Sequence, residues 1–112
     1  MEIAIKELAG GATKIVLQGR FDTTAAVLIE LPFNTVATEK KAIVVDLSAV
    51  SFLSSGGIRV LLMGAKIATS KGGKLTIVCP DNNVAKVLKI AGISNLIPVF
   101  QSENAAVAAV MS

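Results

Sequence analysis

The sequence contains no histidine, no tryptophan and no tyrosine, and it has a single cysteine, Cys79. Histidine is the most common acid–base group of enzymes and the most common metal ligand, so its absence removes the usual chemistry of both kinds of site. The eight acidic residues are scattered and form no close pair or cluster. A single cysteine excludes a disulfide within the chain. We therefore expect no enzymatic activity, no catalytic residue and no metal site.

Cys79 itself does not look like a nucleophile. It follows the run Leu75-Thr76-Ile77-Val78, which is typical of a buried strand. A reactive thiolate needs an accessible, electropositive environment, and nothing in the adjoining sequence supplies one. We interpret Cys79 as a small core residue.

The chain also lacks the features of a nucleic-acid or membrane protein. Its eleven lysines and arginines give a net charge of +3 but are spread along the chain rather than gathered in a patch. Apolar runs such as Ala42–Val45 end long before the about 18–20 residues that a membrane span needs. Residues Met1–Lys6 lack the basic start and apolar core of a signal peptide. We expect a single cytoplasmic domain over residues 1–112 that neither inserts into a membrane nor binds nucleic acid.

What the sequence does contain is a regular order of apolar segments and breaks. We expect strands over residues 2–8, 14–18, 42–47, 74–79 and 96–100, and helices over 23–37, 55–70, 83–91 and 105–111. Asp22 is a favoured cap for the first helix, and Pro32 predicts a kink or an early end within it. Residues 48–53 are expected to form a short connection, and Pro80-Asp81-Asn82 is expected to cap the third helix.

This order predicts the topology. The glycine-containing turn at residues 9–12 is short enough to join the first two strands as an antiparallel hairpin. The later strands are separated by helices, and strands joined by such crossovers pair in parallel. We therefore expect an α/β fold with a mixed, mostly parallel five-stranded sheet, an antiparallel edge hairpin and about four helices packed on it.

The expected helix over 55–70 is apolar on most sides. At helical spacing Ile58, Leu61, Leu62 and Ala65 form a stripe that is most simply the core face. A second apolar row consists of Val60, Gly64 and Ile67. Only Arg59, Met63, Lys66 and Ser70 remain for a narrow exterior. Such a helix is either flanked by neighbouring helices or partly covered by a partner, and the pattern leaves both readings open. In the second reading, Arg59 and Lys66 would frame a contact centred on Met63 for an acidic partner surface.

The segment from Ile43 to Leu62 resembles the STAS domains and, among them, the bacterial anti-sigma factor antagonists. The hallmark of these proteins is a hydrophobic strand, then Asp-Leu-Ser-x-Val-x-Phe, then Asp-Ser-Ser-Gly-Leu-Gly-x-Leu-Leu. Three further segments match the same family, namely residues 17–22, 71–75 and 99–105. The resemblance covers essentially the whole chain and implies the STAS fold.

In the antagonists, the serine directly after the hallmark aspartate is phosphorylated by the partner, an anti-sigma factor that is a protein kinase. Phosphorylation prevents the antagonist from sequestering the kinase, and a protein phosphatase restores it. The acceptor position falls on Ser55, with Ser54 the less favoured candidate. Ser54 stands in place of the aspartate, Gly56 in place of the second hydroxyl residue and Arg59 in place of a common glycine, whereas Gly57 keeps the family residue.

The resemblance also implies the partners and the contact residues. Asp22 would lie beside the phosphorylation turn and assist the partner's reaction. The expected partner-binding set is Asp22, Ser54, Ser55, Gly56, Gly57, Arg59, Met63 and Lys66. ATP and Mg²⁺ would belong to the kinase, so we expect no cofactor on this chain.

Two other functions fit the same residues. Some STAS accessory subunits of ABC-type lipid transporters carry a small residue and a Gly-Gly pair in this turn, as Ser55-Gly56-Gly57 does here. Alternatively, residues 54–57 would form an anion site of a small-molecule or nucleotide sensor, because the start of a helix attracts anions. The apolar content permits a homo-oligomer without requiring one.

Overall fold

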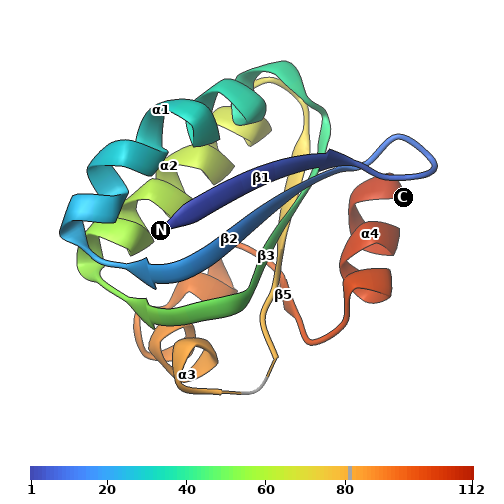
Figure 1. The fold of residues 1–112 in the computed structure, drawn as a ribbon. Coiled ribbons are helices and arrows are strands. Elements are labelled where there is room, and N and C mark those ends of the chain that lie inside the picture. Colours follow the sequence, from blue (N-terminus) through green and yellow to red (C-terminus); the bar gives the residue numbers. More distant parts are fainter. Residues whose placement is uncertain (81) are drawn as a thin grey trace.

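The computed structural model describes residues 1–80 and 82–112, so Asp81 and its expected part in capping a helix lie outside the described residues. Figure 1 shows a twisted sheet with helices on both faces. In chain order the elements are β1 (Glu2–Glu7), β2 (Thr13–Phe21), α1 (Thr23–Glu39), β3 (Ala42–Leu53), α2 (Ser55–Ser70), β4 (Lys74–Val78), α3 (Asn83–Ile90), a 3₁₀ turn (Ile93–Asn95), β5 (Val99–Phe100) and α4 (Glu103–Met111).

The strands lie in the order β1-β2-β3-β4-β5. β1 and β2 form an antiparallel hairpin at one edge, and the other neighbouring pairs are parallel. The predicted mixed sheet with an antiparallel edge hairpin and four helices is therefore confirmed. β3, whose apolar run predicted a strand covered on both faces, lies at the centre.

The two faces of the sheet are covered unequally (Figure 1). Helices α1, α2 and α3 share the larger core with one face, where Ile43, Val45 and Leu47 of β3 point. On the other face α4 alone packs against the sheet, through a small cluster around Val44 and Ala106. Because side chains of a strand alternate between faces, neighbouring residues of β3 enter different cores.

The prediction that residues 48–53 connect a strand to a helix is wrong, because β3 continues to Leu53. β3 carries an extra residue at each of two register shifts against β2, which bends the strand and breaks its alternation. At the first shift the Asp46 carboxylate accepts a hydrogen bond from the Ser48 N–H at 2.9 Å. Asp46 therefore stabilises a bulge within the strand rather than marking its end.

Pro32 neither ends α1 nor shortens it, since the helix continues to Glu39. Residues after the proline, including Phe33 and Val36, are buried in the larger core. Their burial offsets the hydrogen bond that the proline nitrogen cannot donate. β5 is shorter than expected and β2 extends further, to Phe21.

Candidate docking site at the start of helix α2

Ser54 caps α2 and fixes the turn that follows β3. Its hydroxyl donates to the carbonyl of Phe21 at 2.8 Å and accepts from the Gly57 N–H at 3.1 Å. Its own backbone N–H also donates to the Phe21 carbonyl, at 2.9 Å. The side chain of Ser54 is thus committed to joining the end of β2 to the start of α2.

Ser55 follows as the first residue of α2, and its side chain is exposed. Within the described residues its hydroxyl makes no hydrogen bond. The N–H groups of Ser55 and Gly56 also have no acceptor among the described residues, as is usual in the first turn of a helix. This end of the helix carries partial positive charge and suits an anionic group such as a phosphate.

The start of α1 lies beside this turn. Asp22 caps α1, its carboxylate accepting from the Ala25 N–H at 2.9 Å. A Cβ built on Gly56 would lie 3.3 Å from the Cβ of Ala26 and 3.6 Å from the Cα of Thr23. The start of α1, which Asp22 caps, therefore lies beside the turn at residues 54–57.

Gly57 is a packing requirement of the same turn. A Cβ at this position would lie 2.8 Å from a methyl group of Leu53 and 2.9 Å from the ring of Phe21. Such distances are too short for any side chain without movement of the core. Gly57 therefore allows α2 to begin close to the sheet.

The outward side of α2 carries the remaining predicted residues. Arg59, Met63 and Lys66 are all exposed and follow Ser55 at helical spacing, so they share one face. The guanidinium of Arg59 is paired with the carboxylate of Glu30 from α1, with 2.6 Å between Nη2 and Oε1. Arg59, expected to frame a contact with an acidic partner together with Lys66, is thus also paired within its own chain.

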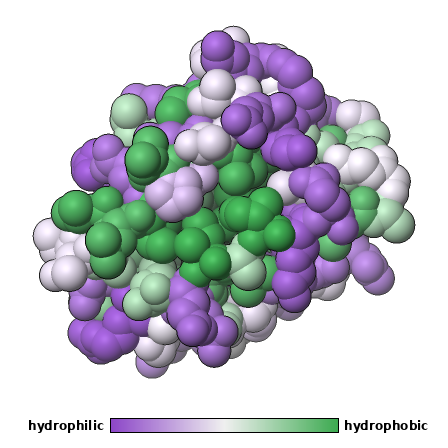
Figure 2. All heavy atoms as spheres, turned by 45° about the horizontal axis from the view of Figure 1, so that its top comes forward, coloured by the Kyte–Doolittle hydropathy of each residue, from purple (hydrophilic) through white to green (hydrophobic). Residues whose placement is uncertain are grey.

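Helix α1 carries an exposed apolar surface that was not predicted from the sequence. Val27, Leu28 and Leu31 are 71%, 70% and 75% exposed, far more than their residue types usually are. Figure 2 shows apolar side chains gathered on the side of the molecule that carries α1 and α2. The sequence pattern could have indicated this surface, because apolar residues occur on every side of this helix rather than on one stripe.

The described residues do not form a reactive-cysteine site or a metal site. Burial, and secondarily the negative charge of Asp46, raise the pKa of the Cys79 thiol to about 11, so at neutral pH it is not a thiolate. Among residues 1–80 and 82–112 there is no group of three or more potential metal-binding side chains. None of the helices described is long and apolar enough to cross a membrane.

Comparison with known proteins shows which family the chain resembles. The STAS domain family matches residues 4–106. A putative anti-sigma factor antagonist of Bordetella bronchiseptica, BtrV, is 34% identical over 70 residues, which are 62% of this chain and 60% of that relative. The match thus spans about three fifths of the length of BtrV.

Two further proteins resemble a larger part of the chain. The anti-sigma F factor antagonist of Paenibacillus polymyxa is 22% identical over 95 residues, 83% of this chain and 81% of the relative. The crystal structure of an anti-sigma factor antagonist from Mycobacterium paratuberculosis matches with a TM-score of 0.89 at 22% identity, covering 99% of this chain and 94% of that one. At that identity the structural match supports the fold.

Proposed function

The chain belongs to the STAS domain family, and we propose that it is an anti-sigma factor antagonist whose binding to a kinase-type anti-sigma factor is switched by phosphorylation of Ser55. The observation that carries the proposal is the difference between two adjacent serines. The Ser54 hydroxyl is held by two hydrogen bonds, whereas the Ser55 hydroxyl is exposed and unbonded among the described residues. A kinase can reach Ser55 without opening the turn.

In this proposal the unphosphorylated chain binds the kinase through the face that carries Ser55, Arg59, Met63 and Lys66, and so frees a sigma factor. Asp22 and the glycines of the turn shape the edge of that face. The exposed apolar side chains of α1 adjoin it and supply area that is favourable to bury. The kinase supplies ATP and Mg²⁺, a phosphatase reverses the modification, and the chain itself catalyses no reaction.

The switch needs no refolding. A phosphate on Ser55 adds about −1.5 to −2 charges at neutral pH. The free N–H groups at the start of α2 would stabilise it in the unbound chain. Binding would then require desolvation of that charge within the interface, so affinity for the kinase falls.

The test is to incubate the chain with its cognate kinase and ATP and to map the modified residue by mass spectrometry. We expect phosphate on Ser55, none on the Ser55→Ala variant, and continued modification of Ser54→Ala. Modification at another residue would reject the assignment. No modification, with binding intact in a transporter complex, would favour the accessory-subunit function instead.

Binding provides a second readout. Ser55→Asp should weaken the complex with the kinase in isothermal titration calorimetry, because it places charge in the docking face. Met63→Asp should weaken it as well, whereas Lys89→Ala, an exposed change on α3, is the matched control. Equal affinities of all these variants would show that the kinase binds elsewhere.

A further inference from the structure

The outer edge of β4 is paired with β5 along only part of its length. The N–H of Ile77 donates to the carbonyl of Pro98 at 3.0 Å, and the N–H of Cys79 donates to that of Phe100 at 2.8 Å. The next donor along β5 would be residue 98, but proline has no N–H. The ladder therefore stops before it reaches Leu75.

The backbone of Leu75 is left facing this edge. Alternate residues of a strand direct their N–H and C=O groups to opposite sides, and Lys74 donates to the Lys41 carbonyl on the β3 side at 2.7 Å. Leu75 consequently points the same way as Ile77. No backbone hydrogen bond from the rest of the described chain meets Leu75 on that side, so one donor and one acceptor are available there.

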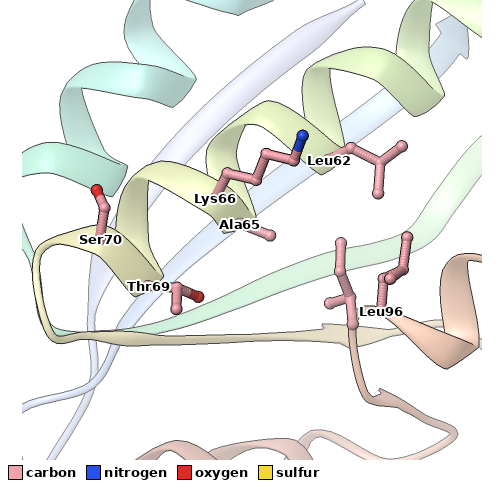
Figure 3. Close-up of a pocket in the computed structure, with 7 residues that line it drawn as sticks. Leu62, Ala65, Lys66, Thr69, Ser70 and Leu96 are labelled. Carbon is pink, nitrogen blue, oxygen red and sulfur yellow. The ribbon is translucent and has the colours of Figure 1, made fainter.

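A groove crosses the sheet at the same place. One hollow of about 350 Å³ lies between Leu62, Ala65 and Lys66 of α2 and the side chain of Leu96, as Figure 3 shows. A second, of about 300 Å³, shares Ala65 and Leu96 with it.

The second hollow continues over Leu75 and Thr76 to Ala109 of α4. Leu75 packs into the larger core, whereas the Thr76 hydroxyl donates to the Ala106 carbonyl of α4. The two hollows therefore flank the open edge from both faces of the sheet.

The groove is apolar with a basic rim. Its lining includes two lysines, Lys66 and Lys74, and no acidic residue. Lys66 forms no ion pair among the described residues. Leu96, which stands between the hollows, is 70% exposed. A ligand that fits would bring apolar groups, negative charge and backbone hydrogen-bonding groups.

We propose that this edge binds an extended peptide segment of a partner protein, which adds to β4 as a strand. Side chains of a strand alternate between its faces, so central apolar residues of the peptide would enter the two hollows in turn. Acidic residues on either side would reach Lys66 and Lys74. The site is distinct from the docking face at Ser55, and Lys66 is the one residue that both include.

The test uses the full chain and two synthetic peptides with the same apolar centre, Glu-Asp-Val-Leu-Val-Asp-Glu and Lys-Lys-Val-Leu-Val-Lys-Lys. Amide resonances of the isotopically labelled protein are followed by NMR during titration. We expect the acidic peptide to shift the amide resonances of residues 73–76, 96 and 97 and the basic peptide to shift none. Methylation of alternate peptide nitrogens should abolish binding in one register and preserve it in the other, because only every second amide of an added strand faces β4.

A matched pair of variants locates the site. Leu96→Asp should lower the affinity for the acidic peptide by about tenfold, as loss of a buried apolar contact typically does. Ile90→Asp is the control, since Ile90 of α3 is 87% exposed but lines neither hollow, and it should leave the affinity unchanged.

Four results would overturn the proposal. These are no shifts with millimolar acidic peptide, shifts confined to other surfaces, equal binding of the basic peptide, and equal losses in the two aspartate variants. A fifth is a dimer of the free chain that dissociates on Leu96→Asp in analytical ultracentrifugation, because the edge would then be occupied by a second copy.

Discussion

Adjacent residues with the same side chain have different environments at the start of α2. Ser54 takes the position of an aspartate in the family hallmark, and both residue types are good helix caps. The hydrogen bond from the Gly57 N–H to the Ser54 hydroxyl preserves that capping role. What the substitution loses is a negative charge beside Ser55, and what it adds is a hydroxyl that donates to Phe21.

This difference predicts unequal effects on stability. Ser54→Ala should lower the free energy of unfolding by about 1–2 kcal/mol, because it removes the cap and leaves the Phe21 carbonyl with one donor fewer. Ser55→Ala should change it by less than about 0.5 kcal/mol, as expected for an exposed side chain. Urea unfolding monitored by circular dichroism measures both. A larger loss for Ser55→Ala would contradict the assignment of the cap to Ser54.

Helices α1 and α2 are in close contact at Gly64. A Cβ at this position would lie 2.0 Å from Cε2 of the Phe33 ring, which is itself fully buried. The absence of a side chain on α2 therefore makes room for the aromatic ring of α1. This contact sets the distance between the two helices that form the proposed docking face.

Gly64→Ala should therefore destabilise the chain, although alanine is the better helix former. We expect a loss of about 1–3 kcal/mol from overpacking, larger than the gain of about 1 kcal/mol in helix propensity. Adding Phe33→Leu should recover part of the loss, because the smaller side chain vacates the space. Thermal unfolding of the two single variants and the double variant gives the coupling. Additive effects would mean that the two residues do not compete for this space.

Replacing Pro32 on α1 should stabilise the chain, in contrast to Gly64→Ala. It lies inside the helix, where its nitrogen cannot donate to the carbonyl four residues earlier. Pro32→Ala should raise the free energy of unfolding by about 1–2 kcal/mol, less than the full cost of an interior proline, because alanine also makes the unfolded chain more flexible. Chemical denaturation measures the change. An unchanged or lower stability would indicate that the ring contributes packing of its own.

The elements also show which parts of the structure local sequence can predict. The cap at Asp22 could be predicted because a cap is a contact between residues three apart. The extension of β3 to Leu53 could not, because its two bulges depend on pairing with β2.

Only some features of the candidate site could be predicted from the sequence. The positions of Ser55, Met63 and Lys66 on one exposed helix face followed from helical spacing. The ion pair of Arg59 with Glu30 and the exposure of Leu28 and Leu31 depend on how α1 packs beside α2, which no local pattern encodes.

At the scale of the whole molecule, ionic contacts hold α4 to the sheet beside a small apolar cluster. The ammonium of Lys14 on β2 lies 3.5 Å from the carboxylate of Asp46 on β3 and 2.5 Å from that of Glu103 on α4. The hydrogen bond and charge of Glu103, opposed in part by desolvation and aided by Asp46, raise the pKa of Lys14 above its ordinary value. Lys14 thus links β2, β3 and α4, and folding favours the charged form of its ammonium group.

The same linkage predicts that the fold weakens at alkaline pH. Lys14 and Cys79 both have a pKa that is raised on folding, so each contributes stability that is complete below its unfolded pKa and lost as the pH rises through its folded value. For Cys79, which burial keeps as a thiol up to a pKa of about 11, the loss falls between about pH 9 and 11. One pKa unit corresponds to about 1.4 kcal/mol, so this group accounts for about 2–3 kcal/mol. Lys14 adds a further decline above pH 10.5.

Two substitutions separate the contributions of Cys79 and Lys14. Because the chain has no tyrosine, the side chains that titrate between about pH 9 and 11 are the cysteine thiol and the lysine amines. Urea unfolding at intervals from pH 7 to 11 should show a falling free energy for the natural chain. Cys79→Ala should be less stable at pH 7, because a buried side chain is shortened, but should lose less between pH 8 and 10.5. Lys14→Met should remove the final decline, whereas Lys89→Met, at an exposed position, should not. Parallel curves for Cys79→Ala and the natural chain would exclude the thiol as the source, and the alkaline loss would then have to come from the lysines.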